Sequence, residues 1–91
     1  MDTDAVSQFV RDAIAALDVL GARDETEYLR TMLEYDGPDV DGAVSSLVKY
    51  GAVTVAWIDR LEAINDAEGG LFDEELAELR EGISTTEAPA A

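Results

Sequence analysis

The apolar residues of this chain recur at helical spacing over most of its length. In residues 5–20 they follow the i, i+3, i+4, i+7 rule, and Gly21 stands where such a helix would end. Asp4, which precedes the pattern, is a suitable capping residue. The pattern therefore predicts an amphipathic first helix. Its apolar stripe comprises Val6, Phe9, Val10, Ala13, Ile14, Leu17 and Leu20.

The second predicted helix is short and is marked at both ends. Asp24 and Glu27 form the Asp variant of a capping box at its start, and Asp36-Gly37-Pro38 ends it. Its apolar stripe consists of Tyr28, Leu29, Met32 and Leu33.

The third predicted helix is the longest. Asp39 caps it, and apolar residues continue at helical spacing until Gly69-Gly70, so it would span about 28 residues. Gly51 lies near its middle and begins a β-rich stretch, residues 51–55, so a bend there is left open. A strand is disfavoured, because the chain has no second β-rich segment with which it would pair.

A last apolar stripe begins at Phe72 and ends near Gly82. Helices joined by short connections predict an all-α fold, namely a small three- to four-helix bundle with a long central third helix. We expect residues 1–83 to form a single helical domain and residues 84–91 to form a disordered tail.

The charge of the chain indicates which partners it favours. The 91 residues include 21 acidic and 6 basic side chains, for a formal net charge of −15. Excess carboxylate repels phosphate backbones and anionic lipids, so we expect no direct binding to nucleic acid or to a membrane surface. Two interpretations of the acidity stay open: adaptation to a salt-rich cytosol, as in a halophile, or a surface for a basic partner.

The sequence offers little catalytic chemistry. It contains no His and no Cys, which removes the commonest general base, the thiolate nucleophiles and the usual transition-metal ligands. Pairs of carboxylates carry little information among so many. We therefore expect no enzymatic activity, no cofactor and no metal site, and no small-molecule substrate is identifiable. The chain lacks a long apolar run and a basic leader, so we expect a cytoplasmic protein.

Two short patterns resemble known sites, and each lacks an essential feature. Residues 36–42 suggest a calcium loop, but aligning Gly42 with the glycine of an EF-hand places Gly37 and Val48 at two ligand positions. The spacing of residues 47–61 suggests a helix-turn-helix, but its second helix would be acidic and would repel a phosphate-lined groove.

In size, helical content and acidity the chain resembles acyl carrier proteins. That family carries a prosthetic group on the Ser of an Asp-Ser-Leu motif at the start of a helix. The nearest match here is Ser45-Ser46-Leu47, which lacks the Asp and lies inside the predicted third helix. The resemblance covers composition only, so we do not expect carrier function.

The candidate interface lies on the third predicted helix. Residues 52–58 would present apolar side chains on nearly every side of a helix, and such a helix has to be covered on every side. Two interpretations stay open: the segment is the centre of the bundle, or part of it contacts a partner or a second copy. The candidate contact residues are Tyr50, Val53 and Trp57, since Trp and Tyr concentrate at interfaces. The overhang of such a long helix also favours a homodimer.

The candidate acidic face lies on the last predicted helix. It is either a solvated surface or a docking surface for a basic protein, and its members are Asp73, Glu74, Glu75, Glu78 and Glu81. We therefore predict a non-enzymatic protein-protein interaction or regulatory module that is homodimeric and salt-adapted. The alternative is an acidic inhibitor or nucleic-acid mimic that occupies a basic site on a nucleic-acid-binding protein.

Overall fold

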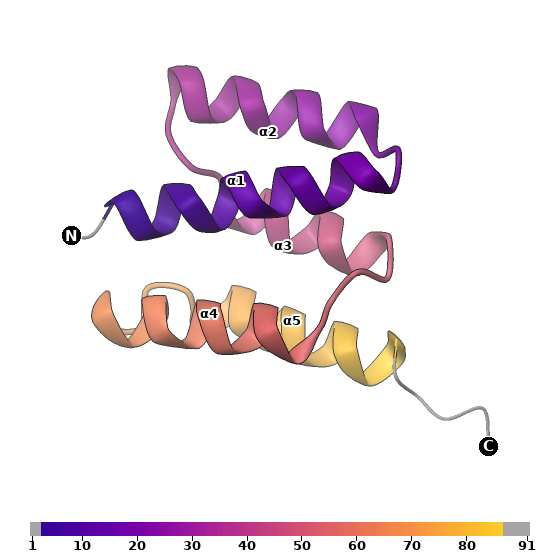
Figure 1. The fold of residues 1–91 in the computed structure, drawn as a ribbon. Coiled ribbons are helices and arrows are strands. Elements are labelled where there is room, and N and C mark those ends of the chain that lie inside the picture. The colour runs from indigo at the N-terminus through magenta and orange to yellow at the C-terminus, as the bar shows by residue number, and fades with distance from the viewer. Residues whose placement is uncertain (1–2, 87–91) are drawn as a thin grey trace.

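The structure, a computed structural model, describes residues 3–86, with side chains placed for residues 5–83. The described residues form α-helices and no strand, which confirms the prediction of an all-α fold. Successive helices run in opposite directions (Figure 1). Residues 3–86 contain five helices, namely α1 (Thr3–Val19), α2 (Arg23–Tyr35), α3 (Val40–Lys49), α4 (Val55–Ala67) and α5 (Asp73–Thr86).

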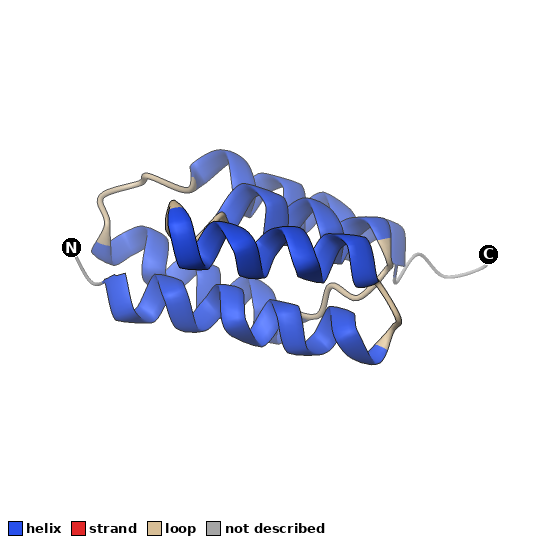
Figure 2. Cartoon of the chain, turned by 90° about the horizontal axis from the view of Figure 1, so that it is seen from above, coloured by secondary structure: helices blue, strands red, loops and turns tan. Residues whose placement is uncertain are grey.

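Helices α1 and α3 occupy the middle of the molecule. Helix α2 packs against both of them on one side, and on the other side α4 packs against α1 while α5 packs against α3 and α4 (Figure 1). The view from above shows that the helices run close to one common direction (Figure 2). Because α1 and α3 are covered from two sides, they supply most of the core.

The buried residues follow this arrangement. All of the first predicted stripe is buried except Leu20, and half of the ten residues of α3 are buried. Helix α2 lies at the edge and buries only Thr26 and Leu29 completely. The largest fully buried side chains, which come from all five helices, are Phe9, Leu17, Leu29, Leu47, Leu61 and Leu79.

The prediction of a single long third helix is wrong, because the chain turns back after Lys49. Gly51 adopts a φ of 64°, which glycine tolerates and other residues disfavour. The amide of Ala52 donates to the carbonyl of Leu47 at 2.9 Å and that of Gly51 to the carbonyl of Val48 at 3.1 Å. This pair of hydrogen bonds is a Schellman motif, which ends α3. The overhanging end on which the expectation of a homodimer rested therefore does not form.

The predicted caps have different outcomes. Asp39 caps α3 as expected, since its side chain accepts a hydrogen bond from the Gly42 amide at 2.9 Å. The prediction that Asp24 and Glu27 form a capping box is wrong, because α2 already begins at Arg23 and no side chain makes a cap hydrogen bond at its start. The turn after α1 leads the chain directly into α2, so Asp24 lies in the first helical turn, where its charge favours the helix dipole.

Helix α5 continues to Thr86 and so extends past Gly82, where the sequence predicted its end. Gly82 is buried, and a Cβ atom there would lie 2.8 Å from Cγ2 of Val48 and 3.3 Å from Cγ2 of Val53. Glycine at this position therefore lets α5 approach α3 closely. The remainder of the predicted tail, residues 87–91, lies outside the described residues.

We predict that Gly82→Ala destabilises the fold by about 1 kcal/mol, because overpacking against the stiff Val48 side chain, about 1–3 kcal/mol, outweighs a gain in helix propensity of about 1 kcal/mol. In a Val48→Ala background the clash is relieved, so the same substitution should stabilise the fold. Urea denaturation of the four proteins in this double-mutant cycle measures both effects. A loss of stability of equal size in both backgrounds would contradict this account of the α3–α5 contact.

Candidate interaction surfaces

The predicted interface residues do not form one exposed surface. Val53 is only 2% exposed and belongs to the core. Trp57 is half-buried and packs edge-on against Phe9, with ring centroids 5.4 Å apart and an interplanar angle of 86°. Tyr50 is the most exposed of the three candidates. The continuous apolar helix that suggested this interface is interrupted between α3 and α4, so its side chains face different surroundings.

Trp57 belongs to a contact between α1 and α4. The Arg60 guanidinium lies over both aromatic rings, 5.6 Å from the centroid of Phe9 and 5.5 Å from that of Trp57. Arg60 also forms an ion pair with Asp12 at 2.8 Å. Cation–π contacts and this partly buried ion pair fix Arg60 in place. The cluster therefore holds α4 against α1, and the ring of Trp57 is largely engaged within the chain.

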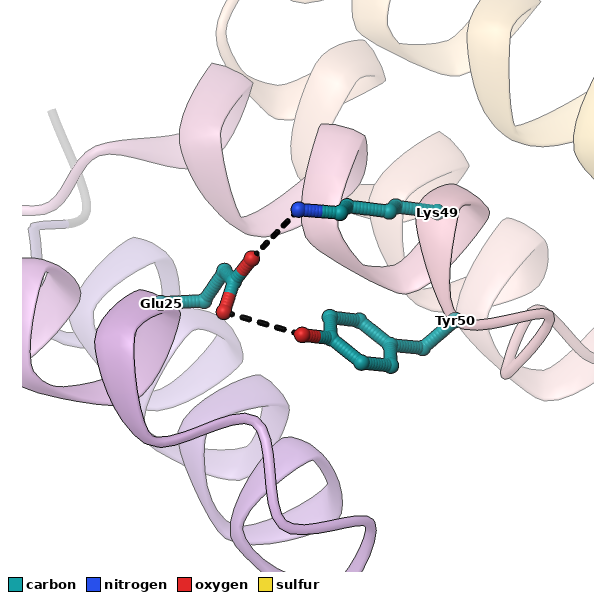
Figure 3. A network of polar contacts seen from close by, with 3 residues as sticks. All are labelled: Glu25, Lys49 and Tyr50. Atoms are coloured by element: carbon teal, nitrogen blue, oxygen red, sulfur yellow. Dashed lines mark hydrogen bonds and ion pairs between the residues drawn. The ribbon is translucent and has the colours of Figure 1, made fainter.

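Tyr50 takes part in a polar network, which we call the clasp, consisting of Glu25, Lys49 and Tyr50 (Figure 3). One oxygen of Glu25 accepts a hydrogen bond from Lys49 Nζ at 2.8 Å, and the other accepts one from the Tyr50 hydroxyl at 3.1 Å. Glu25 lies in the first turn of α2, whereas Lys49 is the last residue of α3 and Tyr50 is its C-cap. The clasp therefore ties the edge helix to the middle of the molecule.

The protonation states of the clasp favour a structural role over a catalytic one. The hydrogen bond from Lys49 lowers the pKa of Glu25, and the hydrogen bond to Glu25 raises the pKa of Lys49. The hydrogen bond to Glu25 also raises the pKa of Tyr50. A lysine and a tyrosine that hold their protons more tightly than usual are poor general bases near neutral pH.

Four of the six basic residues join helices to one another. Each ion pair among the described residues links two different helices: Arg30 with Asp18, Lys49 with Glu25, Arg60 with Asp12, and Arg80 with Glu62. With so few cations in the chain, this placement gives them a part in helix packing. The sequence carried no signal for these partners, because the paired residues lie far apart along the chain.

Large apolar side chains are exposed at one end of the molecule, where the α1–α2 and α3–α4 turns lie together (Figure 1). Val19 ends α1 with 87% of its surface exposed, and Leu20 follows it with 49% exposed. Tyr50 caps α3, and Val55 begins α4 with 56% exposed. We call these four residues the apolar end. Of the predicted interface, it includes only Tyr50.

The structure brings together part of the predicted acidic face. Glu74, Glu78 and Glu81 lie within about 60° of one another around α5, at about 100° per residue. The Ser45 hydroxyl donates to Glu78 at 3.0 Å, and α3 and α5 run in the same direction (Figure 1). Asp41, one turn before Ser45, is therefore level with Glu74, one turn before Glu78. The carboxylates thus continue from α5 onto α3.

Asp73, another member of the predicted acidic face, is the first residue of α5 and contacts α4. It accepts a hydrogen bond at 2.6 Å from Asn65, whose side-chain oxygen accepts one from the Phe72 amide, also at 2.6 Å. Asn65 is buried, and these bonds satisfy its amide. The spacing of apolar residues gives no signal for the role of Asn65, because its partners lie beyond the turn that follows α4. Glu75, half-buried, lies on the opposite flank of α5 from Asp73.

The described residues do not form the sites suggested by the calcium-like segment, the helix-turn-helix spacing or the match to the carrier-protein motif. Within residues 3–86, no group of three or more acidic side chains is arranged to hold a metal ion, and Asp39 of the calcium-like segment caps α3. Helices α3 and α4 do not pack on each other as a helix-turn-helix pair would. Ser45 lies inside α3 and not at its start. Among the described helices, none is long and apolar enough to cross a membrane.

Comparison of this chain with models of protein families, with curated protein sequences and with solved structures found no match.

We predict that Glu25→Gln lowers the melting temperature at neutral pH. The pKa of Glu25 is lowered by folding, so its contribution is present above the usual glutamate pKa and is lost as the pH falls through the lowered value. Lys49 and Tyr50 have raised pKa values, so their contributions are lost only at alkaline pH. The difference in melting temperature from the wild type should therefore be constant from about pH 5 to 9 and should shrink below about pH 4.

The control is Glu27→Gln, which makes the same charge change at an exposed position of the same helix. Thermal unfolding followed by circular dichroism at constant KCl compares the three proteins. An equal effect of both substitutions, or a Glu25→Gln effect that persists undiminished at pH 3, would contradict the role given to the clasp.

Proposed function

We propose that this chain is a non-enzymatic protein-protein interaction module that forms a homodimer through its apolar end. The supporting observation is the exposure of Val19, Leu20, Tyr50 and Val55 at one end of the molecule. Exposed apolar side chains are costly to leave in water, and a group of them at one end of a molecule favours a contact with another protein there. Two copies that meet through the same surface form a closed, twofold-symmetric dimer.

The clasp favours this surface as a contact. Hydrogen bonding to Glu25 holds the Tyr50 side chain, so less conformational entropy would be lost when a partner covers it. Lys49 and Glu25 lie beside the apolar end and would supply polar groups at its margin. An apolar centre with a polar margin is the usual composition of a protein-protein interface.

We test this proposal with Leu20→Ser, which removes an exposed apolar side chain from the apolar end. We expect the variant to shift the equilibrium from dimer to monomer, because full burial of a leucine contributes about 1.5–3 kcal/mol. Leu71→Ser is the matched control, since Leu71 is 57% exposed in the α4–α5 turn at the opposite end of the molecule (Figure 1). Sedimentation equilibrium measures the mass. A wild-type monomer at high protein concentration, or an equal loss of dimer in both variants, would refute the proposal.

Salt adaptation is the second part of the proposal. Acidic residues occur on every helix, and the described ion pairs engage few of them. Such a dispersed charge repels itself in dilute buffer and is screened in molar salt, where the screening length is about 3 Å. The distribution of acidic residues over every helix favours adaptation to the solvent over recognition of one partner.

As a second candidate function, this chain is an acidic inhibitor or nucleic-acid mimic that binds a basic site on another protein. The specific observation that favours it is the continuation of the α5 carboxylates Glu74, Glu78 and Glu81 onto Asp41 of α3. A row of carboxylates on adjacent helices can occupy a site that otherwise binds phosphates. Binding of this kind would weaken steeply as salt rises.

One titration separates the two interpretations of the acidity. For salt adaptation we expect the melting temperature to rise as KCl increases from about 0.1 M to about 3 M, because screening relieves self-repulsion. Circular dichroism at 222 nm follows the transition. A melting temperature that does not change over this range would contradict salt adaptation and would leave the docking of a basic partner as the better account of the charge.

A further inference from the structure

A groove of about 440 Å³ lies between α1 and α2. Apolar side chains from both helices line its middle, namely Ile14 and Ala15 from α1 and Leu33 from α2. The remaining lining residues are Arg11, Asp18 and Arg30. Its volume falls in the range of small-ligand sites, about 300–1,000 Å³.

The basic residues are distributed unevenly around this groove. Arg30 is paired with Asp18, so these two charges meet at one end, although their closest approach is only 4.0 Å. Arg11 lies two turns before Asp18, about 10 Å away along α1 at 1.5 Å per residue. The groove is therefore bounded by a loose ion pair at one end and by a lone guanidinium near the other.

Arg11 differs from most other cations of the chain. Four of the six basic residues form the ion pairs that join helices, whereas within the described part of the chain Arg11 forms none. Its side chain is exposed and lines the groove. In a chain with 21 acidic residues, a guanidinium that pairs with no carboxylate of residues 5–83 and lies beside an apolar groove is available to an external anion.

We propose that the α1–α2 groove binds a small amphipathic carboxylate, with the anionic group on Arg11 and the aliphatic body over Ile14, Ala15 and Leu33. A guanidinium recognises a carboxylate through two parallel hydrogen bonds, which fixes the position of the head group. The apolar middle of the groove then covers one side of a hydrocarbon chain. At the far end Asp18 and Arg30 are paired with each other, so that end supplies no unpaired cation for a second carboxylate, and the site favours an acid with one charged end.

This inference is independent of the proposed dimer. The apolar end is formed by the α1–α2 and α3–α4 turns, whereas the groove lies along the sides of α1 and α2. Loss of dimerisation therefore leaves the groove proposal standing, and failure of ligand binding leaves the dimer proposal standing.

The experiment titrates the ¹⁵N-labelled full chain with octanoate and follows amide chemical shifts, at a KCl concentration where the chain is fully helical. We expect saturable shifts at residues 11–18 and 30–33. Arg11→Gln should weaken binding about tenfold, the usual effect of losing one charge-assisted hydrogen-bonded pair. Arg23→Gln is the matched control, because Arg23 is also exposed and forms no ion pair with another described residue but does not line the groove.

Two further measurements separate recognition of the carboxylate from adsorption to an apolar surface. Octan-1-ol, which has a similar chain and no charge, should bind about tenfold more weakly than octanoate. Ala15→Leu should abolish binding by filling the groove without altering any charge. The proposal would be overturned by absent or non-saturable shifts, by equal binding of the alcohol and the acid, or by equal affinities of the Arg11→Gln and Arg23→Gln variants.

Discussion

The reversal of the chain at Gly51 is the constraint on which the rest of the fold depends. The positive φ of this residue ends α3 and turns the chain, so that α4 returns along α1. The reversal places α4 and α5 on one side of α1 and α3, with α2 on the other. It also directs Val53 into the core, where it meets Gly82 of α5. The close contact between α3 and α5 thus follows from a turn near the middle of the chain.

Much of this fold was predictable from the sequence, and the main error has a definite physical cause. The helical spacing of apolar residues predicted α1 and α2, and Gly21 indicated the end of α1. Gly51 makes the same Schellman turn as Gly21, and both are preceded four residues earlier by Leu and followed by Ala. Periodicity concealed this signal, because the apolar positions of α4 continue in phase with those of α3. A search for the Leu-x-x-x-Gly-Ala pattern would have found the second turn.

The candidate surfaces were harder to predict, because they depend on which helices become neighbours. The sequence left open whether Trp57 lies at the centre of the bundle or at an interface, and in the structure its ring packs on Phe9 beneath Arg60. Partners separated by tens of residues, such as Glu25 and Lys49, leave no local pattern. The same holds for the groove beside Arg11, whose walls come from two helices. In so acidic a chain, the positions of the few cations reveal more about helix packing and ligands than the abundant carboxylates do.

The most direct test of this account is a distance between α3 and α4. The chain has no native cysteine, so Asp41→Cys and Ala63→Cys provide specific positions for a pair of spin labels. In one continuous helix the labelled positions would be about 33 Å apart, at 1.5 Å per residue. Because the chain reverses at Gly51, we predict a double electron–electron resonance distribution centred well below that value. A distribution centred near 33 Å would show that the two helices are continuous and would contradict the account.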